Sequence, residues 1–247
     1  MRFRVIGPGR AGSSMADALV QRGWSDLGRL GRVDDHAGAG LDVDVVIVAV
    51  PDDAIAAVAA AVTPGSACLV HLSGAATLDR LAPHRRRASV HPLVSLPDPV
   101  VGARRLKAGA TFAVAGDVAA TDIVDALGGT AIEVPDERRA VYHAAAAVAA
   151  NHLVALCAQV ERLADAAGVP TSAYRELMAR TLDNVAAGGA AAALTGPAAR
   201  GDLTTVAAHL DAIDRAEHDL YLALADAAAA LAGRPGLSSR LRAGEPD

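Results

Sequence analysis

The sequence predicts an α/β domain with a largely parallel sheet followed by an all-α domain, and three observations carry this prediction. Residues 1–134 alternate short β-rich runs with helical runs, which is typical of an α/β domain. From Pro135 the sequence shows no convincing strand and consists of long alanine-rich helical segments. Hydrophobic residues make up 52% of the 247 residues, which is enough to bury a sizeable core.

The elements of the first domain follow from hydrophobic patterns. Residues 43–50 form a near-continuous β-branched run, as expected for a strand buried on both faces of a sheet, and Pro51 ends it. The other strands are expected at 3–6, 67–72, 88–91, 111–115 and 130–134, and helices at 10–22, 52–62 and 117–127.

Helix-stop signals divide the second domain, which we place at residues 135–232. Gly168-Val169-Pro170 ends a long helix that begins near Asp136, and Gly188-Gly189 ends the next one. Helices are therefore expected at 136–167, 172–187, 202–213 and 216–231. Residues 233–247 are rich in Gly, Pro, Ser and charge, and we expect them to form a mobile tail.

Charge and cysteine content exclude several classes of function. The formal net charge of −5 lacks the basic footprint of a general nucleic-acid-binding protein. Lys107 is the sole lysine, which nearly eliminates lysine catalysis. Cys68 and Cys157 are too few and too far apart to suggest a disulfide framework or a zinc site, and no metal site is expected.

The two isolated cysteines predict a reducing, cytoplasmic setting, with which the N-terminus and the apolar segments agree. The N-terminus enters a β-rich run at once, so we expect no signal peptide. Residues 140–160 are apolar but are interrupted by Tyr142, His143, Asn151, His152 and Gln159. We expect this helix to be buried in protein rather than in lipid.

A glycine loop is the first chemical signal. Gly7-Pro8-Gly9-Arg10-Ala11-Gly12 fits the G-x-G-x-x-G pattern between the first strand and the first helix. Gly7 permits a tight turn, Gly9 lets a pyrophosphate approach the backbone, and Gly12 allows the helix to lie against the strand. The helix N-terminus then offers N–H groups and a positive dipole to phosphates. The loop predicts dinucleotide binding; the alternative is a glycine-rich turn without a ligand.

The end of the second strand distinguishes the two dinucleotides. Sites for NAD usually place an acidic residue there to hold the ribose hydroxyls. Here Arg29 and Arg32 occupy the region, with Asp34 and Asp35 slightly later. An arginine can pair with a 2′-phosphate, so we expect NADP rather than NAD, with Arg32 as the first candidate and Arg29 as the second. The alternative is that both arginines face solvent.

Further polar residues follow neighbouring strands at the expected cofactor edge. Val50-Pro51 follows the buried strand and should line the cofactor crevice. Ser73 and His91 end the next strands, so each could face the nicotinamide end or the substrate, or could be only a turn or packing residue.

Several segments together carry a family resemblance. Besides the glycine loop they are 49–53, His71–Gly74, His91–Leu93, Tyr142–Ala145, Ala150–His152 and Leu194–Asp202, with His209. In these segments the chain resembles the bacterial family with a Rossmann-like domain followed by a domain of unknown function, number 2520. The resemblance extends to about residue 232, and Thr195-Gly196-Pro197-x-x-Arg200-Gly201-Asp202 is its most specific part.

More distantly, the layout is similar to that of pyrroline-carboxylate reductases, ketopantoate reductases and β-hydroxyacid dehydrogenases. Those enzymes place substrate between their two domains and dimerise through the helical one. In β-hydroxyacid dehydrogenases a helical lysine lies four residues before an asparagine. Asn151 would match that asparagine, but Ala147 stands at the lysine position, so another proton donor is needed.

His143 is the candidate donor, and Arg200 is the candidate substrate anchor. On a regular helix His143 and Asn151 lie about 80° apart and about 12 Å along the axis, so both cannot hold the same reacting atom. The alternative for His143 is a hydrogen-bonded interface histidine. Arg200 lies in a glycine-rich segment and could bind a carboxylate bidentately, while Asp202 would cap the next helix.

These residues predict an NADP-dependent oxidoreductase that reduces a small carboxylate-bearing carbonyl or imine compound. Ketopantoate is the leading substrate on resemblance alone. The alternative is an NADP-binding sensor or partner protein without turnover, which the missing lysine favours. We expect a homodimer through the helical domain, because alanine-rich helices have little to bury alone, and no nucleic-acid or membrane partner.

Overall fold

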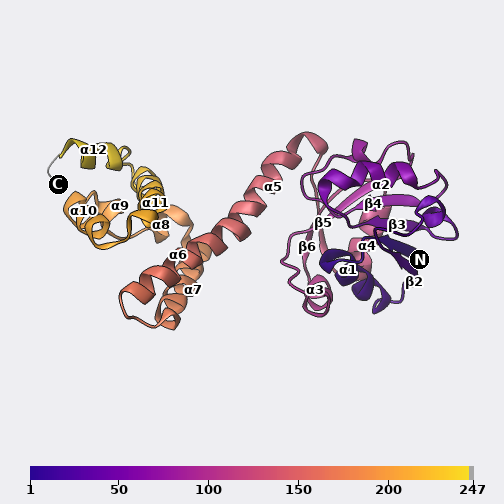
Figure 1. Ribbon diagram of the computed structural model, residues 1–247, viewed down its shortest axis with the longest axis horizontal. Coiled ribbons are helices and arrows are strands. Elements are labelled where there is room, and N and C mark those ends of the chain that lie inside the picture. Colours follow the sequence, from indigo (N-terminus) through magenta and orange to yellow (C-terminus); the bar gives the residue numbers. More distant parts are fainter. Residues whose placement is uncertain (245–247) are drawn as a thin grey trace. The chain divides into compact units, whose positions relative to one another are not determined.

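The structure, a computed structural model, describes residues 1–244, and the chain divides into two compact units (Figure 1). The first unit spans Met1–Asn151 and contains a sheet with its covering helices; the second begins at His152 and is helical. The boundary thus follows Asn151, whereas composition placed it after residue 134. As a result, the beginning of the long helix belongs to the sheet unit.

Within residues 1–244, seven strands form one sheet in the order β2-β1-β3-β4-β5-β6-β7. Every neighbouring pair is parallel except β5 and β6, which are antiparallel. The largely parallel sheet is therefore confirmed. The strands are β1 (Arg2–Ile6), β2 (Ser25–Leu30), β3 (Val45–Val48), β4 (Cys68–His71), β5 (Arg87–Pro92), β6 (Thr111–Gly116) and β7 (Thr130–Glu133).

Helices cover both faces of this sheet. One face packs on α1 (Arg10–Val20), α3 (Pro99–Leu106) and α4 (Ala119–Leu127), and the other packs on α2 (Ile55–Ala61) with the short turns η1 (Ala37–Gly40) and η3 (Leu78–Leu81). All four residues of β3 are buried: Val45 and Ile47 belong to the first core, and Val46 and Val48 to the second. The β-branched run is thus buried on both faces, as its pattern predicts.

Helix α3 was not predicted from the sequence; it ends at Leu106, and Lys107 lies in the turn that follows. Asp98 caps it by accepting a hydrogen bond from the Val101 N–H at 2.9 Å, and Pro99 occupies its first turn. Both are recognised helix-start signals, but the helix has only eight residues, which is too short for a clear apolar period.

The strand order creates a switch point beside β1. The chain passes from β1 to β2 on one side and then returns to form β3 on the other side of β1. Connections that leave in opposite directions open a crevice at the carboxyl ends of the strands, where ligands of such sheets bind. The glycine loop follows β1 at this crevice.

The long helix expected at 136–167 is present with an interruption. It comprises η4 (Asp136–Arg138), α5 (Arg139–Ala147), a π-helical turn (Val148–His152) and α6 (Leu153–Ala166). By length and composition alone Asp136–Ala166 could cross a membrane, a test that helices of soluble proteins also pass. We expected this helix to be buried in protein. A single copy of the chain does not bury the most apolar stretch of the helix.

The second unit continues with α7 (Thr171–Gly188), α8 (Ala190–Ala193), α9 (Pro197–Arg200), α10 (Leu203–Ala212), η6 (Arg215–Glu217) and α11 (His218–Leu231). A small core joins Leu203 and Val206 of α10 to Ala225 and Ala229 of α11. Leu237 completes this core, because Leu237–Ala243 forms a further helix, α12, where the sequence suggested a mobile tail. Residues 245–247 of that tail lie outside the described residues.

A buried arginine ties the long helix to the sheet unit. Arg139 is 0% exposed, and its guanidinium donates to the carbonyl oxygens of Ala76 at 2.7 Å and Ser73 at 3.0 Å, and to the Ser89 hydroxyl. Asp136 adds a second tie by accepting a hydrogen bond from the Leu78 N–H at 3.0 Å. These contacts explain why the first unit extends past residue 134.

We predict that Arg139→Ala lowers the free energy of unfolding by about 3 kcal/mol or more, because buried acceptors lose their donor. Arg138→Ala is the matched control: Arg138 is the exposed neighbour, and its loss should cost less than about 0.5 kcal/mol. Urea unfolding followed by circular dichroism measures both. Equal losses in the two variants would show that Arg139 is not the anchor.

Candidate active site

The glycine loop has the geometry that a phosphate-binding turn requires. Gly7 has a φ of +92°, and a Cβ there would lie 2.5 Å from the Ala49 carbonyl oxygen, so only glycine fits between β1 and β3. Gly9 caps α1 without a side-chain hydrogen bond, and a Cβ at this position would meet nothing within 4 Å. The backbone at the N-terminus of α1 is therefore open to an anion.

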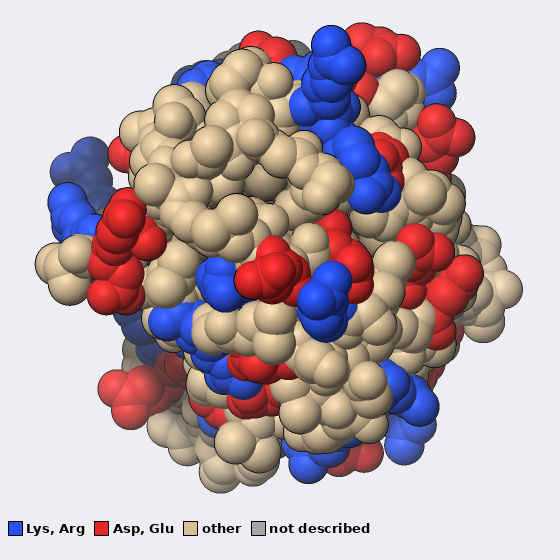
Figure 2. Space-filling model, turned by 90° about the vertical axis from the view of Figure 1, so that its right-hand side faces the viewer, with Lys and Arg blue, Asp and Glu red and all other residues tan. Residues whose placement is uncertain are grey.

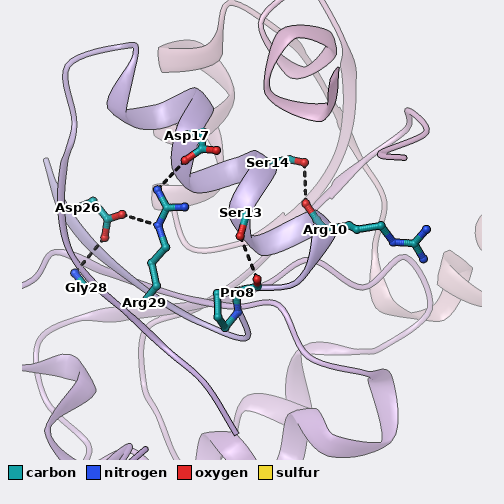
Figure 3. Close-up of polar contacts among 8 residues, drawn as sticks. All are labelled: Pro8, Arg10, Ser13, Ser14, Asp17, Asp26, Gly28 and Arg29. Carbon is teal, nitrogen blue, oxygen red and sulfur yellow. Dashed lines mark hydrogen bonds and ion pairs between the residues drawn. The ribbon is translucent and has the colours of Figure 1, made fainter. Parts of the chain in front are cut away.

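This loop opens into a cavity of about 840 Å³ at the carboxyl edge of the sheet. Of the residues predicted to bind a cofactor, those lining it are Gly7, Pro8, Gly9, Arg32, Val50 and Pro51. The remaining three, Arg10, Ala11 and Gly12, form the first turn of α1 and do not line the cavity. The Arg10 side chain extends away from the helix (Figure 3).

The two candidate arginines differ in their surroundings. Arg29 lies between Asp17 and Asp26, with an ion-pair distance of 2.7 Å to each carboxylate (Figure 3). Its guanidinium therefore fastens β2 to α1. Arg32 is exposed and lines the cavity. Beside it lies His36, a lining residue that the sequence did not single out, whose Nε2 is 3.0 Å from the Gly31 carbonyl oxygen.

A second hollow, of about 580 Å³, lies within the same unit. It brings together three of the predicted catalytic residues, His91, His143 and Asn151, although they come from β5 and from the long helix. The other lining residues are Pro92, Leu93, Val94, Ser95, Tyr142, Ala145, Ala146, Ala147, Ala149 and Ala150. The hollow is thus mostly apolar with a few polar groups, as binding sites for small molecules commonly are.

Tyr142 lies in a segment of the family resemblance but was not predicted as a catalytic residue. Its hydroxyl lies 2.6 Å from Nδ1 of His91, and His91 also meets His143 edge to face, with ring centroids 6.0 Å apart. Burial raises the pKa of Tyr142, while Arg139 acts in the opposite direction. Burial, with His143 and Arg139, lowers the pKa of His91 to about 4, so this imidazole is neutral at neutral pH.

Ser73 lines neither cavity, but it lies in a turn that contacts residues in or beside both. Its hydroxyl donates to Asp52 at 2.8 Å and accepts hydrogen bonds from the N–H groups of Ala75 and Ala76. The next residue, Gly74, lies against His91 and His143. Because Pro51 and Asp53 line the first cavity, the turn at Ser73 links the cofactor edge to the histidine cluster.

Behind this turn lies a second neutral imidazole. His71 is fully buried next to Ser89 in the sheet, and within residues 1–244 neither ring nitrogen has a hydrogen-bond partner. Burial, reinforced by Arg139, lowers its pKa to about 4. The buried Arg139 thus acts on both imidazoles and disfavours their charged forms.

Asn151 reaches the second hollow from an irregular turn. It lies in the π-helical turn Val148–His152, is exposed, and lines the hollow. The π turn changes the angle between His143 and Asn151 from that of a regular helix, which the sequence analysis assumed. Turns of this kind are frequent at functional sites.

Arg200 belongs to the helical unit. Its guanidinium lies 3.6 Å from the Asp202 carboxylate, and its side chain is 65% exposed. Asp202 accepts hydrogen bonds from the N–H and hydroxyl of Thr205, which confirms it as the cap of α10. Thr195 and Arg200 line a shallow hollow of about 380 Å³.

The surface charge is mixed. In Figure 2 acidic and basic side chains alternate over the visible face and surround an uncharged area. Among residues 1–244, no group of three or more His, Cys, Asp or Glu side chains could hold a metal ion.

One protein-family model matches a part of this chain. Residues 111–228 match the family model described as Domain of unknown function (DUF2520). This match extends from β6 through the histidine-bearing helix α5 into α11. No curated protein matches the sequence significantly.

Solved structures share the fold over nearly the whole chain. The protein TM1727 from Thermotoga maritima has a TM-score of 0.71 and 24% identity, covering 94% of this chain and 98% of its own. BF3122 from Bacteroides fragilis, provisionally named an NADP oxidoreductase, has a TM-score of 0.77 and 19% identity, covering 93% and 98%. Pyrroline carboxylate reductase from Plasmodium falciparum, solved with NADP bound, has a TM-score of 0.60 and 11% identity, covering 94% and 98%. The region that matches DUF2520 thus begins within the Rossmann-like sheet, at β6, and continues through the helices that follow it.

Proposed function

We propose that this protein is an NADP-dependent oxidoreductase that reduces a small carboxylate-bearing carbonyl or imine compound. The observation that carries the proposal is an open glycine loop at the switch point of the sheet, in a cavity that Arg32 lines. Similar folds named as an NADP oxidoreductase and as an NADP-bound reductase support it.

The residues present fit a phosphorylated dinucleotide. Gly9 leaves room for the pyrophosphate beside the N-terminus of α1, which has no side-chain cap. Val50 and Pro51 line the cavity along the carboxyl end of β3. Arg32 offers an exposed guanidinium that can pair with a 2′-phosphate, whereas Arg29 is held by two carboxylates.

When bound, the reduced cofactor supplies a hydride to the substrate carbon. The protein must then orient the substrate, stabilise the negative charge that develops on its oxygen or nitrogen, and deliver a proton. The second hollow offers Tyr142, His143 and Asn151 for these tasks. With Ala147 at the position of the dehydrogenase lysine, these groups take its place.

We assign the carboxylate of the substrate to Arg200. The guanidinium is mostly exposed and, among the described residues, lies 3.6 Å from the Asp202 carboxylate, which leaves it available for a bidentate pair with a second carboxylate. Ketopantoate is our leading candidate among 2-oxo acids. The protein would act in the cytoplasm, where NADPH is available to it.

A second copy of the chain is the proposed partner of the helical unit. Helix α7 has 18 residues and buries none of them, although Leu177 and Leu182 are apolar. Val154 on α6 is likewise exposed. Most of the stability of a helix comes from packing an apolar face, so these helices need a covering surface, and a homodimer would supply it.

We predict that Arg32→Ala weakens NADPH binding about 10- to 100-fold, because a charged hydrogen bond worth about 1.5–3 kcal/mol is lost. NADH binding should be nearly unchanged, since it has no 2′-phosphate. Arg29→Ala is the control and should affect both cofactors equally. Fluorescence titration measures the affinities. Tighter binding of NADH than NADPH by the unaltered protein would contradict the assignment.

Turnover tests the reductase itself. NADPH consumption with a panel of 2-oxo acids should identify a substrate. We then expect Asn151→Ala to lower kcat with little effect on NADPH affinity, and Arg200→Ala to raise KM for the carboxylate substrate about 10- to 100-fold. Cofactor binding without consumption would favour an NADP-binding sensor or partner protein instead.

Light scattering at micromolar concentration tests the homodimer. We expect the mass of two chains, and we expect Leu177→Asp to give the mass of one, because a charge would enter the apolar interface. Val100→Asp is the matched control: Val100 is a 79% exposed valine on α3, and its substitution should leave the dimer intact. A single-chain mass for the unaltered protein would refute the proposal.

A further inference from the structure

Tyr142 and His91 form a tight polar pair inside the second hollow. The Tyr142 hydroxyl is 2.6 Å from His91 Nδ1, and the rings meet at 87° with centroids 5.6 Å apart. Within the described residues, no Arg, Lys, Asp or Glu side chain lines this hollow. The described lining of the hollow thus carries no permanently charged side chain. The pair of Tyr142 and His91 is a source of a proton within it.

We propose that Tyr142 is the proton donor of the reduction proposed above, and that His91 donates a hydrogen bond from Nδ1 to the phenol oxygen. This inference rests on the proposed function. A neutral imidazole has one N–H, and when this N–H is at Nδ1 the phenol hydrogen is free to point into the hollow. The substrate oxygen or nitrogen can then accept it.

The step balances with one proton drawn from solvent. The carbonyl carbon gains a hydride, and the π electron pair of the C=O or C=N bond moves to the heteroatom. The O–H bond of Tyr142 breaks, and its proton forms a bond to that heteroatom. The phenolate keeps the hydrogen bond from His91 and regains a proton from water when the product leaves. His91 retains its proton throughout and is a positioning residue.

The charged and titratable groups around the pair agree with these roles. Arg139 and His143 on α5 disfavour a charge on His91, Asp52 acts in the opposite direction, and His71 is a neutral neighbour. With a pKa of about 4, His91 stays neutral, so it does not protonate the substrate itself. Burial raises the pKa of Tyr142, and Arg139 offsets part of this rise by favouring the phenolate form.

His143 is the competing donor, and its packing distinguishes it from Tyr142. A Cβ on Gly74 would lie 2.7 Å from Cδ2 of His143 and 2.9 Å from Nε2 of His91, so backbone closes the space beside these two rings. His143 meets His91 through a ring edge, whereas Tyr142 has a polar partner that can stabilise its deprotonated form. Proton transfer from Tyr142 leaves an anion, and His91 is a hydrogen-bond partner that can stabilise it.

Kinetics of the full-length protein test the donor. With a 2-oxo acid that supports turnover, Tyr142→Phe should lower kcat about 100-fold or more and leave NADPH affinity, measured by fluorescence, unchanged. The matched control is Tyr221→Phe, because Tyr221 makes the same 2.6 Å contact with His209 Nδ1 outside the hollow. The control should keep full kcat. Normal kcat in Tyr142→Phe, with loss of kcat in His143→Asn, would overturn the proposal.

Titration of the phenol tests the direction of the hydrogen bond and needs no cofactor. The ultraviolet absorbance of the phenolate, taken as the difference between the unaltered protein and Tyr142→Phe, gives the pKa of Tyr142. His91→Phe should raise this pKa, because the phenolate loses its donor, and His91→Gln should raise it less. A lowered or unchanged pKa would overturn the proposal, since it would mean that His91 does not donate to Tyr142.

The kinetics and the phenol titration test the reductase function and the proton donor separately. If the unaltered protein consumes no NADPH with any carbonyl or imine compound, the proposed function fails, and the titration still decides whether His91 donates to Tyr142. If turnover is present but Tyr142→Phe retains it, the assignment of the proton donor alone is wrong.

Discussion

The buried guanidinium of Arg139 is the constraint on which the arrangement of the site depends. It is held by carbonyl oxygens of the turn after β4 and by the Ser89 hydroxyl of β5. The long helix therefore leaves the sheet from one fixed point. Tyr142 and His143 follow Arg139 by three and four residues, so they lie on the same side of α5 as the anchor. This register places both side chains against His91.

The same cation sets the electrostatics of the cluster. It disfavours protonation of His71 and His91, and it favours the deprotonated form of Tyr142. A positive charge held in a poorly solvated region by fixed dipoles acts more strongly than the same charge in water. Arg139 thereby offsets part of the cost of burying a negative charge on oxygen, which is the charge that develops when a carbonyl group is reduced. Arg139 can therefore support the chemistry without contacting the substrate.

Local signals in the sequence predicted the fold and the cofactor edge. The β-branched run before Pro51 and the glycine loop after β1 each have a local physical cause, so their placement followed from composition and spacing. Helix α3 and helix α12 were missed because short helices with a weak apolar period depend on contacts made elsewhere, such as those of Leu237 with α10 and α11.

The histidine cluster could be predicted only in part. His91 and His143 were selected as polar residues at a strand end and on an apolar helix, but nothing in the sequence related one to the other. Their proximity depends on Arg139, whose burial cannot be recognised from the residues around it. Tyr142 adjoins His143 in the sequence, yet its pairing with His91 is a tertiary contact. The π turn at Asn151 also escaped a prediction based on regular helical angles.

The central claim is that one edge of the sheet holds the cofactor from the glycine loop to the histidine cluster. A crystal structure of the protein grown with NADPH tests it most directly. We predict the pyrophosphate at Gly9, the 2′-phosphate at Arg32 and the nicotinamide ring beside His91 and Tyr142. A cofactor whose nicotinamide ring points away from His91, or whose 2′-phosphate has no contact with Arg32, would contradict the account.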